Sequence, residues 1–134
     1  MSLLATSNNL ITLIYNSSSS LGKQTLAYVK ASTKSMRFID VFKENITGTQ
    51  WLEIAEKLNM SIGDLVDKEH GDFKKENVSN QLNLETNDWL KILDKQPQLL
   101  QYSILIKGEE FILINTPSEV ANHISPDSGG IDIP

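Results

Sequence analysis

The stretch from residue 10 to residue 42, LITLIYNSSSSLGKQTLAYVKASTKSMRFIDVF, carries the pattern that decides the fold. Leu10–Tyr15 is rich in β-branched and apolar residues, which predicts a buried strand. A polar turn at Asn16–Ser20 follows, and Leu21–Ala31 has its apolar residues along one side of a helix. The alternation in Arg37–Phe42 predicts a second strand. Strand, turn, helix and strand in this order predict a βαβ unit.

The middle of the chain carries the start signals of two helices. Thr47 with Gln50 forms a capping-box pattern, and apolar residues then recur at i, i+3, i+4 and i+7. This combination predicts an amphipathic helix, and Trp51 on its apolar stripe is interpreted as a core residue. Ser61 with Asp64 repeats the capping pattern ahead of a short helix.

A polar connection and a further helix follow. Residues 67–84 are mostly polar, and we expect a mobile connection there with a partial turn of helix. Residues 85–95 predict a helix whose apolar stripe includes Trp89, a second core residue. Pro97 ends this helix because proline cannot continue the hydrogen-bond ladder.

The C-terminal part changes from helical to strand periodicity. The apolar runs Ser103–Lys107 and Phe111–Asn115 are joined by Gly108–Glu110, which predicts a hairpin with a short loop. Thr116–Glu119 then supplies an N-cap, a proline at the first helical position and a glutamate at the third. A final helix through Ile124 is therefore expected.

The element order is β-α-β-α-α-α-β-β-α, which predicts an α/β (α+β) fold. Its four-stranded mixed sheet would carry flanking helices and a helical insertion. The length of 134 residues fits one domain with a sizeable core. We expect a flexible N-terminus at residues 1–9, a single domain at 10–124 and a flexible tail at 125–134.

Composition excludes several classes of function. The sequence contains no cysteine, which excludes disulfide scaffolds, zinc–thiolate sites and cysteine nucleophiles. The net charge of -5 and the single arginine, Arg37, argue against a nucleic-acid surface. The acidic clusters lack a metal-ligand framework, so no metal site is expected.

No membrane or targeting signal stands out in the sequence. The longest apolar runs are too short to span a bilayer, and the N-terminal residues lack the positive region of a signal peptide. We therefore expect a cytoplasmic protein that does not bind membranes.

Three separated segments resemble the arsenate-reductase family of thioredoxin-fold proteins. Ile14–Asn16 followed by Thr25–Leu26 is similar to the family's strand, loop and helix. Gln96–Leu100 resembles its His-Pro-x-Leu-Ile element, and Gly108 with Thr116–Val120 resembles its closing Gly … Arg-Pro-Ser-Glu-Val. The resemblance implies a thioredoxin-like fold. The family includes glutathione-dependent arsenate reductases and redox-sensing regulators that bind RNA polymerase.

The departures from that resemblance concern the reactive centre. Ser19 lies where the family has its reactive cysteine, and Ser103 lies where a thioredoxin fold normally has its cis-proline. The other altered positions replace a proline (Ser17), a regulator's second cysteine (Gly22), an arginine of the loop (Lys23) and the arginines that hold the oxyanion (Asp67, Tyr102 and Thr116).

These losses bear directly on the chemistry. The family reaction needs a thiolate, and a serine hydroxyl forms no disulfide, so the redox cycle cannot turn over. Serine acts as a nucleophile only beside a base. His70 and His123 are the only histidines, and we interpret both as surface residues. No cofactor is therefore expected, and glutathione enters only if Ser19 serves in a different enzyme.

The serine-rich loop before the first helix has two interpretations. Asn16, Ser18, Ser19, Ser20 and Lys23 could hold a small anion with backbone N–H groups, the helix dipole and an ammonium group. The same serines could instead cap the helix and satisfy its unpaired donors. We favour the capping interpretation.

Three functions remain open at this point. The leading hypothesis is a binding or regulatory module without thiol redox catalysis, whose partner is a protein or a small anion. One alternative is a glutathione-linked oxidoreductase or transferase that uses Ser19. Another is a redox-independent regulator that binds RNA polymerase. The sequence leaves the oligomeric state open.

Overall fold

The computed structural model describes residues 11–30, 36–77 and 84–124. Within these residues, four strands form one mixed sheet in the order β2-β1-β3-β4. β1 and β2 are parallel, whereas β1 with β3 and β3 with β4 are antiparallel. The strands are β1 (Ile11–Tyr15), β2 (Met36–Asp40), β3 (Ser103–Lys107) and β4 (Glu110–Ile114). The predicted four-stranded mixed sheet is confirmed.

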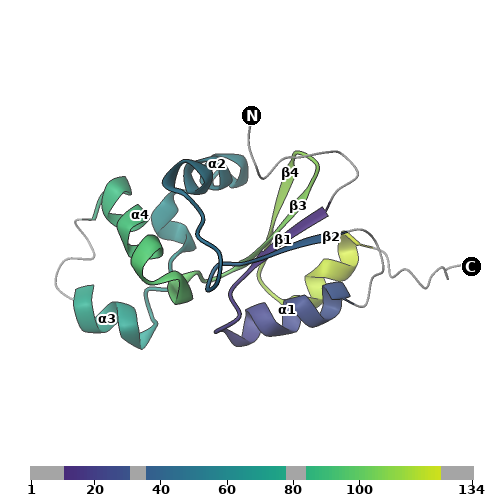
Figure 1. Ribbon diagram of the computed structural model, residues 1–134, viewed down its shortest axis with the longest axis horizontal. Coiled ribbons are helices and arrows are strands. Elements are labelled where there is room, and N and C mark those ends of the chain that lie inside the picture. Colours follow the sequence, from purple (N-terminus) through teal and green to yellow (C-terminus); the bar gives the residue numbers. More distant parts are fainter. Residues whose placement is uncertain (1–10, 31–35, 78–83, 125–134) are drawn as a thin grey trace, which may run out of the picture.

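Helices cover both faces of this sheet. The α1 helix and the 3-10 helix η4 lie on one face, and α2 lies across the other (Figure 1). The α4 and α3 helices form the insertion beyond the end of the sheet (Figure 1). The helices are α1 (Ser20–Lys30), α2 (Gly48–Leu58), η1 (Ile62–Leu65), α3 (Gly71–Asn77), α4 (Thr86–Lys95), η3 (Pro97–Leu99) and η4 (Pro117–Asn122).

The alternation of side chains along the strands divides the core into two clusters. Leu13 of β1 packs with Leu105 and Val120 on the side of α1 and η4. The next residue, Ile14, packs with Trp51 and the larger cluster on the side of α2 and α4. Successive strand residues point to opposite faces, so a five-residue strand serves both clusters.

The insertion is anchored by aromatic packing. Phe73 of α3 is 0% exposed, and its ring stacks on Trp89 of α4 with centroids 5.8 Å apart. The Nζ of Lys68 lies 5.1 Å from the Trp89 ring and donates to the carbonyl of Gly63. The connection expected at residues 67–84 therefore contains more helix than predicted, because Phe73 has a buried site against α4. Residues 78–83 lie outside the described chain.

The start of α2 matches the sequence pattern. Thr47 Oγ1 accepts from the Gln50 N–H at 3.1 Å, and Gln50 Oε1 accepts from the Thr47 N–H at 3.0 Å. The α4 helix ends one residue before Gln96, which precedes Pro97. The capping-box helix and the proline stop are confirmed.

Several predicted boundaries differ from the structure by one or two residues. β2 ends at Asp40 rather than Phe42, because the Asp40 carbonyl accepts from Lys43 and Glu44 and forms a turn. The hairpin loop is one residue shorter than predicted, since Glu110 already pairs with Lys107. Gly108 has a φ of 64°, as the first position of a type II′ turn requires.

The final helix is also shorter than predicted. It is a 3-10 helix that ends at Asn122, so it does not continue through Ile124. The Lys107 Nζ donates to the carbonyl of His123 at 2.9 Å, which holds the chain just after this end.

The predicted flexible segments 1–9 and 125–134 lie outside the described residues. Among the helices that are described, none has the length and apolar character needed to cross a membrane.

Candidate functional site

The register of the sheet brings the predicted site positions to one end. Tyr15 pairs with Asp40 at the end of β1 and β2, and Ser103 pairs with Ile114 at the corresponding end of β3 and β4. The loop after β1, the turn after β2 and the segment after β4 therefore begin at the same edge of the sheet. This end of the sheet, where β1, β2 and β4 finish and β3 begins, is the candidate site.

Asn16 organises the loop that follows β1. Its side chain is buried, and its Oδ1 accepts from the N–H and the hydroxyl of Ser18 at 2.9 and 2.7 Å. Its Nδ2 donates to the carbonyl of Gln98 at 2.8 Å and to that of Leu100 at 3.3 Å. A single amide therefore uses both its donor and its acceptor to tie the loop to the segment before β3.

Ser19 is the N-cap residue of α1. Its Oγ accepts from the Gly22 N–H at 2.9 Å and donates to the carbonyl of Asn16 at 3.1 Å. Its own carbonyl accepts the first helical bond from the Lys23 N–H. The residue thus lies at the N-terminus of α1, where its hydroxyl caps the helix and also donates a hydrogen bond to the preceding loop.

Gly22 lies where α1 and the loop approach most closely. A Cβ added there would overlap the carbonyl oxygen of Asn16. A cysteine at this position, as in the redox-sensing regulators, is incompatible with the observed approach of helix and loop.

The other polar groups of the loop are largely paired. The Ser17 N–H donates to Asp40 Oδ1 at 3.2 Å, and the Ser20 hydroxyl accepts from Gln24. From Ser17 to Lys23, the N–H groups of Ser20 and Leu21 are the ones without a hydrogen bond to the described residues. The structure therefore leaves two backbone donors and the exposed Lys23 for any small anion.

Asp40 is a site residue that the sequence analysis did not identify. It is buried, and its Oδ1 accepts from Ser17 and Phe42. Its Oδ2 is buried without a hydrogen-bond partner in the described part of the chain. The signal was available: an acid at the end of the second strand of a βαβ unit must lie beside the loop that ends the first.

Tyr15 reports the electrostatic character of this edge. Burial raises its pKa above the ordinary value of 10.0, and the negative charges of Asp40 and Glu44 raise it further. The carboxylates of Asp40 and Glu44 therefore disfavour a further negative charge at the end of β1 and β2.

The three positions that the resemblance matches to arginines hold side chains without a positive charge. The Asp67 N–H donates to the Leu99 carbonyl, and the Asp67 carboxylate accepts from the backbone N–H of Glu69. Tyr102 is half-buried just before β3, and Thr116 is exposed at the start of η4. Ser103 is buried, and its Oγ lacks a partner among the described residues.

The hydrogen bonds of Ser19 to the described residues involve neither histidine. His70 Nδ1 accepts from the Asp72 N–H at 3.0 Å, which uses the ring to begin α3. His123 follows η4, and within the described residues neither ring hydrogen-bonds to Ser19. The described residues also contain no group of three acids or histidines that could hold a metal ion.

Comparison with known proteins gives similarity in structure alone. No protein-family model and no curated protein matches the sequence. An arsenate reductase from Vibrio cholerae superposes with a TM-score of 0.72 at 13% identity, covering 86% of this chain and 98% of that one. A candidate arsenate reductase from Yersinia pestis gives 0.71 at 17% identity, with coverages of 84% and 98%.

An arsenate-reductase-related protein from Brucella melitensis gives a TM-score of 0.64 at 12% identity, covering 90% of this chain and 97% of that one. Similarity at these identities establishes the fold and leaves the chemistry to the residues present. The chain has the thioredoxin-like fold of arsenate reductases and contains no cysteine.

Proposed function

We propose that this protein acts without thiol redox catalysis, as a binding or regulatory module built on the arsenate-reductase fold. The observation that carries the proposal is the hydrogen bonding of the Ser19 hydroxyl. The residue lies at the start of α1, and its hydroxyl is used as donor and acceptor inside the loop. The sequence also has no cysteine that could supply a thiolate from another position.

The surroundings of Ser19 support the same conclusion. A serine nucleophile needs an adjacent base to take its proton. Here the hydroxyl donates to the Asn16 carbonyl, which is not a base of useful strength. Asp67, Tyr102 and Thr116 supply no positive charge with which to hold an oxyanion. We therefore propose no cofactor and assign glutathione no role.

Two ligand classes fit a binding module, a small anion and a protein. An anion at the start of α1 would have the free N–H groups of Ser20 and Leu21 and the exposed Lys23. The buried Asp40 carboxylate already accepts the Ser17 N–H and opposes a second negative charge there. A protein partner is therefore the class that we favour, and a cytoplasmic location without membrane or nucleic-acid binding stays a prediction.

The direct test is arsenate reduction with glutathione and glutaredoxin. We expect the wild-type protein to give no turnover above the rate without protein. Ser19→Ala is the matched variant, and it should behave as the wild type does. Turnover that Ser19→Ala abolishes would instead establish an enzyme and contradict the proposal.

A further inference from the structure

A chain of hydrogen bonds connects the start of α3 to the loop before α1. The side-chain Nε2 of Gln98 donates to Asp72 Oδ2 at 3.0 Å, and the carbonyl of Gln98 accepts from Asn16 Nδ2 at 2.8 Å. Asn16 in turn holds the loop through the N–H and the hydroxyl of Ser18. Gln98, a residue of the short helix η3, therefore links the helical insertion to the candidate site.

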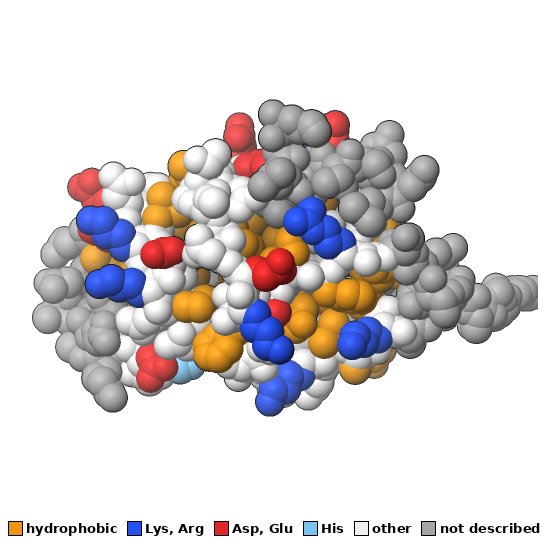
Figure 2. All heavy atoms as spheres, in the orientation of Figure 1, with side chains coloured by type: hydrophobic (Ala, Val, Ile, Leu, Met, Phe, Trp, Pro, Cys, Tyr) orange, Lys and Arg blue, Asp and Glu red, His pale blue; other side chains and the backbone are white. Residues whose placement is uncertain are grey.

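His70 lies at the outer end of this chain of hydrogen bonds. Its Nδ1 accepts from the Asp72 N–H at 3.0 Å and lies 3.9 Å from Asp72 Oδ2, the same oxygen that accepts from Gln98. The side chains of His70 and Asp72 are 36% and 50% exposed, so protons from solvent reach both. In Figure 2 a histidine side chain reaches the surface next to an acidic side chain, in the region where Figure 1 has the start of α3.

The observed geometry requires a neutral His70. A ring nitrogen accepts a hydrogen bond only while it carries no proton, and both ring nitrogens of an imidazolium are donors. Histidine is the side chain whose charge ordinarily changes between about pH 5 and pH 8. Protonation of Nδ1 would therefore abolish the bond from the Asp72 N–H and would place a new donor beside the Asp72 carboxylate.

The protonated ring and the Gln98 amide would then compete for one carboxylate oxygen. A cation is attracted to a carboxylate by a Coulomb energy that a neutral amide lacks. Asp72 would therefore turn toward His70, and Gln98 would lose the side-chain bond that joins η3 to α3.

The charged groups on the same segment as His70 are already engaged with one another. Glu69 forms an ion pair with Lys74 at 2.9 Å. The carboxylate of Asp67 accepts from the Glu69 N–H at 3.0 Å. The Asp72 carboxylate is therefore the charged group that directly faces the His70 ring.

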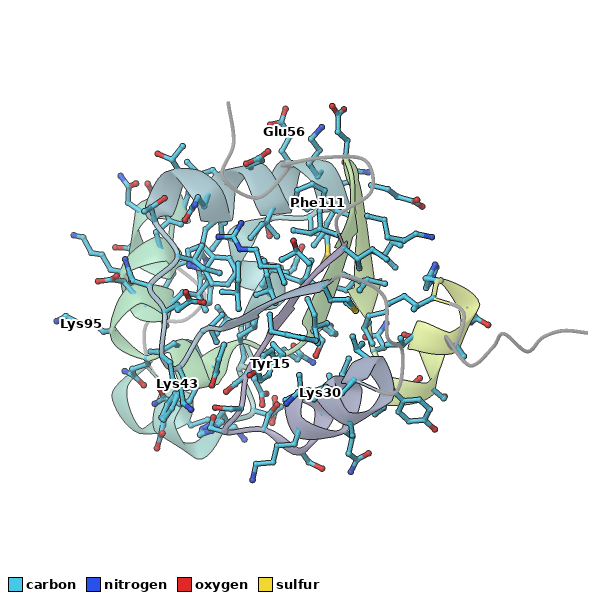
Figure 3. All side chains as sticks on the ribbon, turned by 45° about the vertical axis from the view of Figure 1, so that its right-hand side comes forward. Tyr15, Lys30, Lys43, Glu56, Lys95 and Phe111 are labelled. Atoms are coloured by element: carbon cyan, nitrogen blue, oxygen red, sulfur yellow. The ribbon has the colours of Figure 1, made fainter. Side chains whose placement is uncertain are left out.

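The elements packed around this segment add no competing charge. Neither η3 nor the loop Asn16–Ser20 contains a charged side chain. The Nζ of Lys68 donates to a carbonyl and lies over the Trp89 ring. Lys95, in the last turn of α4, points outward in Figure 3. The charged side chains in the second half of α4 are all exposed, namely Lys91, Asp94 and Lys95.

We propose that His70 is a pH-sensitive switch that controls the loop before α1. Neutral His70 caps α3 and leaves Asp72 to hold Gln98, whose carbonyl holds Asn16. Protonated His70 takes the Asp72 carboxylate and releases η3 from α3, so Asn16 and the loop become less constrained. This regulation rests on the proposed function, because it acts on the loop of the binding module.

The test is a pH titration of the isotope-labelled protein by NMR between about pH 5 and pH 8. The Asp72 N–H reports the bond to His70, and the side-chain amide of Asn16 reports the loop. We expect both signals to shift with one common midpoint. The Asp72 amide proton should move upfield as acid is added, because it loses its acceptor.

Three variants assign the response. His70→Asn keeps an uncharged capping oxygen at this position and should abolish both responses. His123→Asn removes the only other histidine and should leave both responses unchanged. Gln98→Leu removes the side-chain bond to Asp72, so the Asp72 signal should still respond to pH whereas the Asn16 signal should not.

The outcomes separate the switch from the proposed function. An Asn16 signal that stays constant over this pH range in the wild-type protein would overturn the switch. A response that persists in His70→Asn, or an Asn16 response of Gln98→Leu equal to that of the wild type, would overturn it as well. The titration measures neither catalysis nor ligand binding, so the proposed function stands when the switch fails, and only arsenate turnover overturns that function.

Discussion

Gly22 and Asn16 show how single residues fix the loop before α1. The loop carbonyl of Asn16 occupies the space that a side chain at Gly22 would need. The Asn16 side chain in turn holds the carbonyls of Gln98 and Leu100. At this scale, stability depends on a close backbone approach and on complete pairing of one buried amide.

Gly22→Ala should lower the free energy of unfolding by about 2–4 kcal/mol, because backbone atoms must move to admit the methyl group. Urea denaturation monitored by circular dichroism measures the loss. Gly48→Ala is the matched control, since its added Cβ has its nearest neighbour, a Leu90 methyl carbon, at 3.8 Å. The control should be neutral or more stable by about 0.5–1 kcal/mol. Equal stability of Gly22→Ala and wild type would contradict the close approach.

Tyr15 predicts a dependence of stability on alkaline pH. Its folded-state pKa is raised above 10.0 by burial and then by Asp40 and Glu44. The unfolded chain therefore loses the phenolic proton first, so the Tyr15 contribution is present below about pH 10 and is lost as pH rises through the raised pKa. Tyr15→Phe should show a smaller loss of stability between about pH 9 and pH 11 in urea denaturation.

The comparison for Tyr15 needs a second phenol variant. Tyr28→Phe removes a phenol that is 50% exposed on α1 and controls for the substitution itself. Identical alkaline slopes for Tyr15→Phe and the wild type would show that this phenol is not the group responsible.

At the scale of elements, local sequence signals predict where helices start, but they do not predict the contacts between elements that stabilise those helices. The Thr47 and Gln50 pattern predicts α2 because its hydrogen bonds are local. The sequence predicts only a partial turn of helix where α3 lies, because the stability of α3 comes from Phe73 stacked on Trp89, a contact between separate helices. Likewise, η4 ends before Ile124. Lys107 of β3 donates to the carbonyl of His123, the residue that follows η4.

Ser19 is an example of a sequence signal for helix capping, which is a structural role. Ser19→Ala should lower the free energy of unfolding by about 1 kcal/mol, because it leaves the Gly22 N–H without its cap. Ser19→Asn retains a capping oxygen and should stay close to the wild type. Thermal denaturation of the three proteins tests this, and a stability of Ser19→Ala equal to the wild type would argue against the capping role.

At the scale of the whole molecule, the order of elements is sufficient to predict the fold and the edge at which the site lies. The pairings at that end of the sheet are less predictable, since the contacts of Asn16 with Gln98 and of Ser17 with Asp40 join residues that the sheet brings together from separate segments. Ser103 shows this limit. The resemblance matches it to the cis-proline position, but only the structure shows that its hydroxyl is buried without a partner among the described residues.

The two core clusters predict one cooperative unfolding transition. They share the central strands β1 and β3, so neither cluster can come apart without exposing the other. Trp51 and Trp89 both lie in the larger cluster and report on it by fluorescence. Tryptophan fluorescence and far-ultraviolet circular dichroism should therefore give the same urea midpoint. Two separate midpoints would show that the faces of the sheet unfold independently.

The bond between Asp40 and the Ser17 N–H has a consequence for protein engineering. A cysteine introduced at residue 19 would place a thiol on a loop that already has a buried carboxylate at its base. A neighbouring negative charge disfavours the thiolate form. Installing a reactive thiol on this scaffold would therefore require a change of Asp40 together with the change of Ser19.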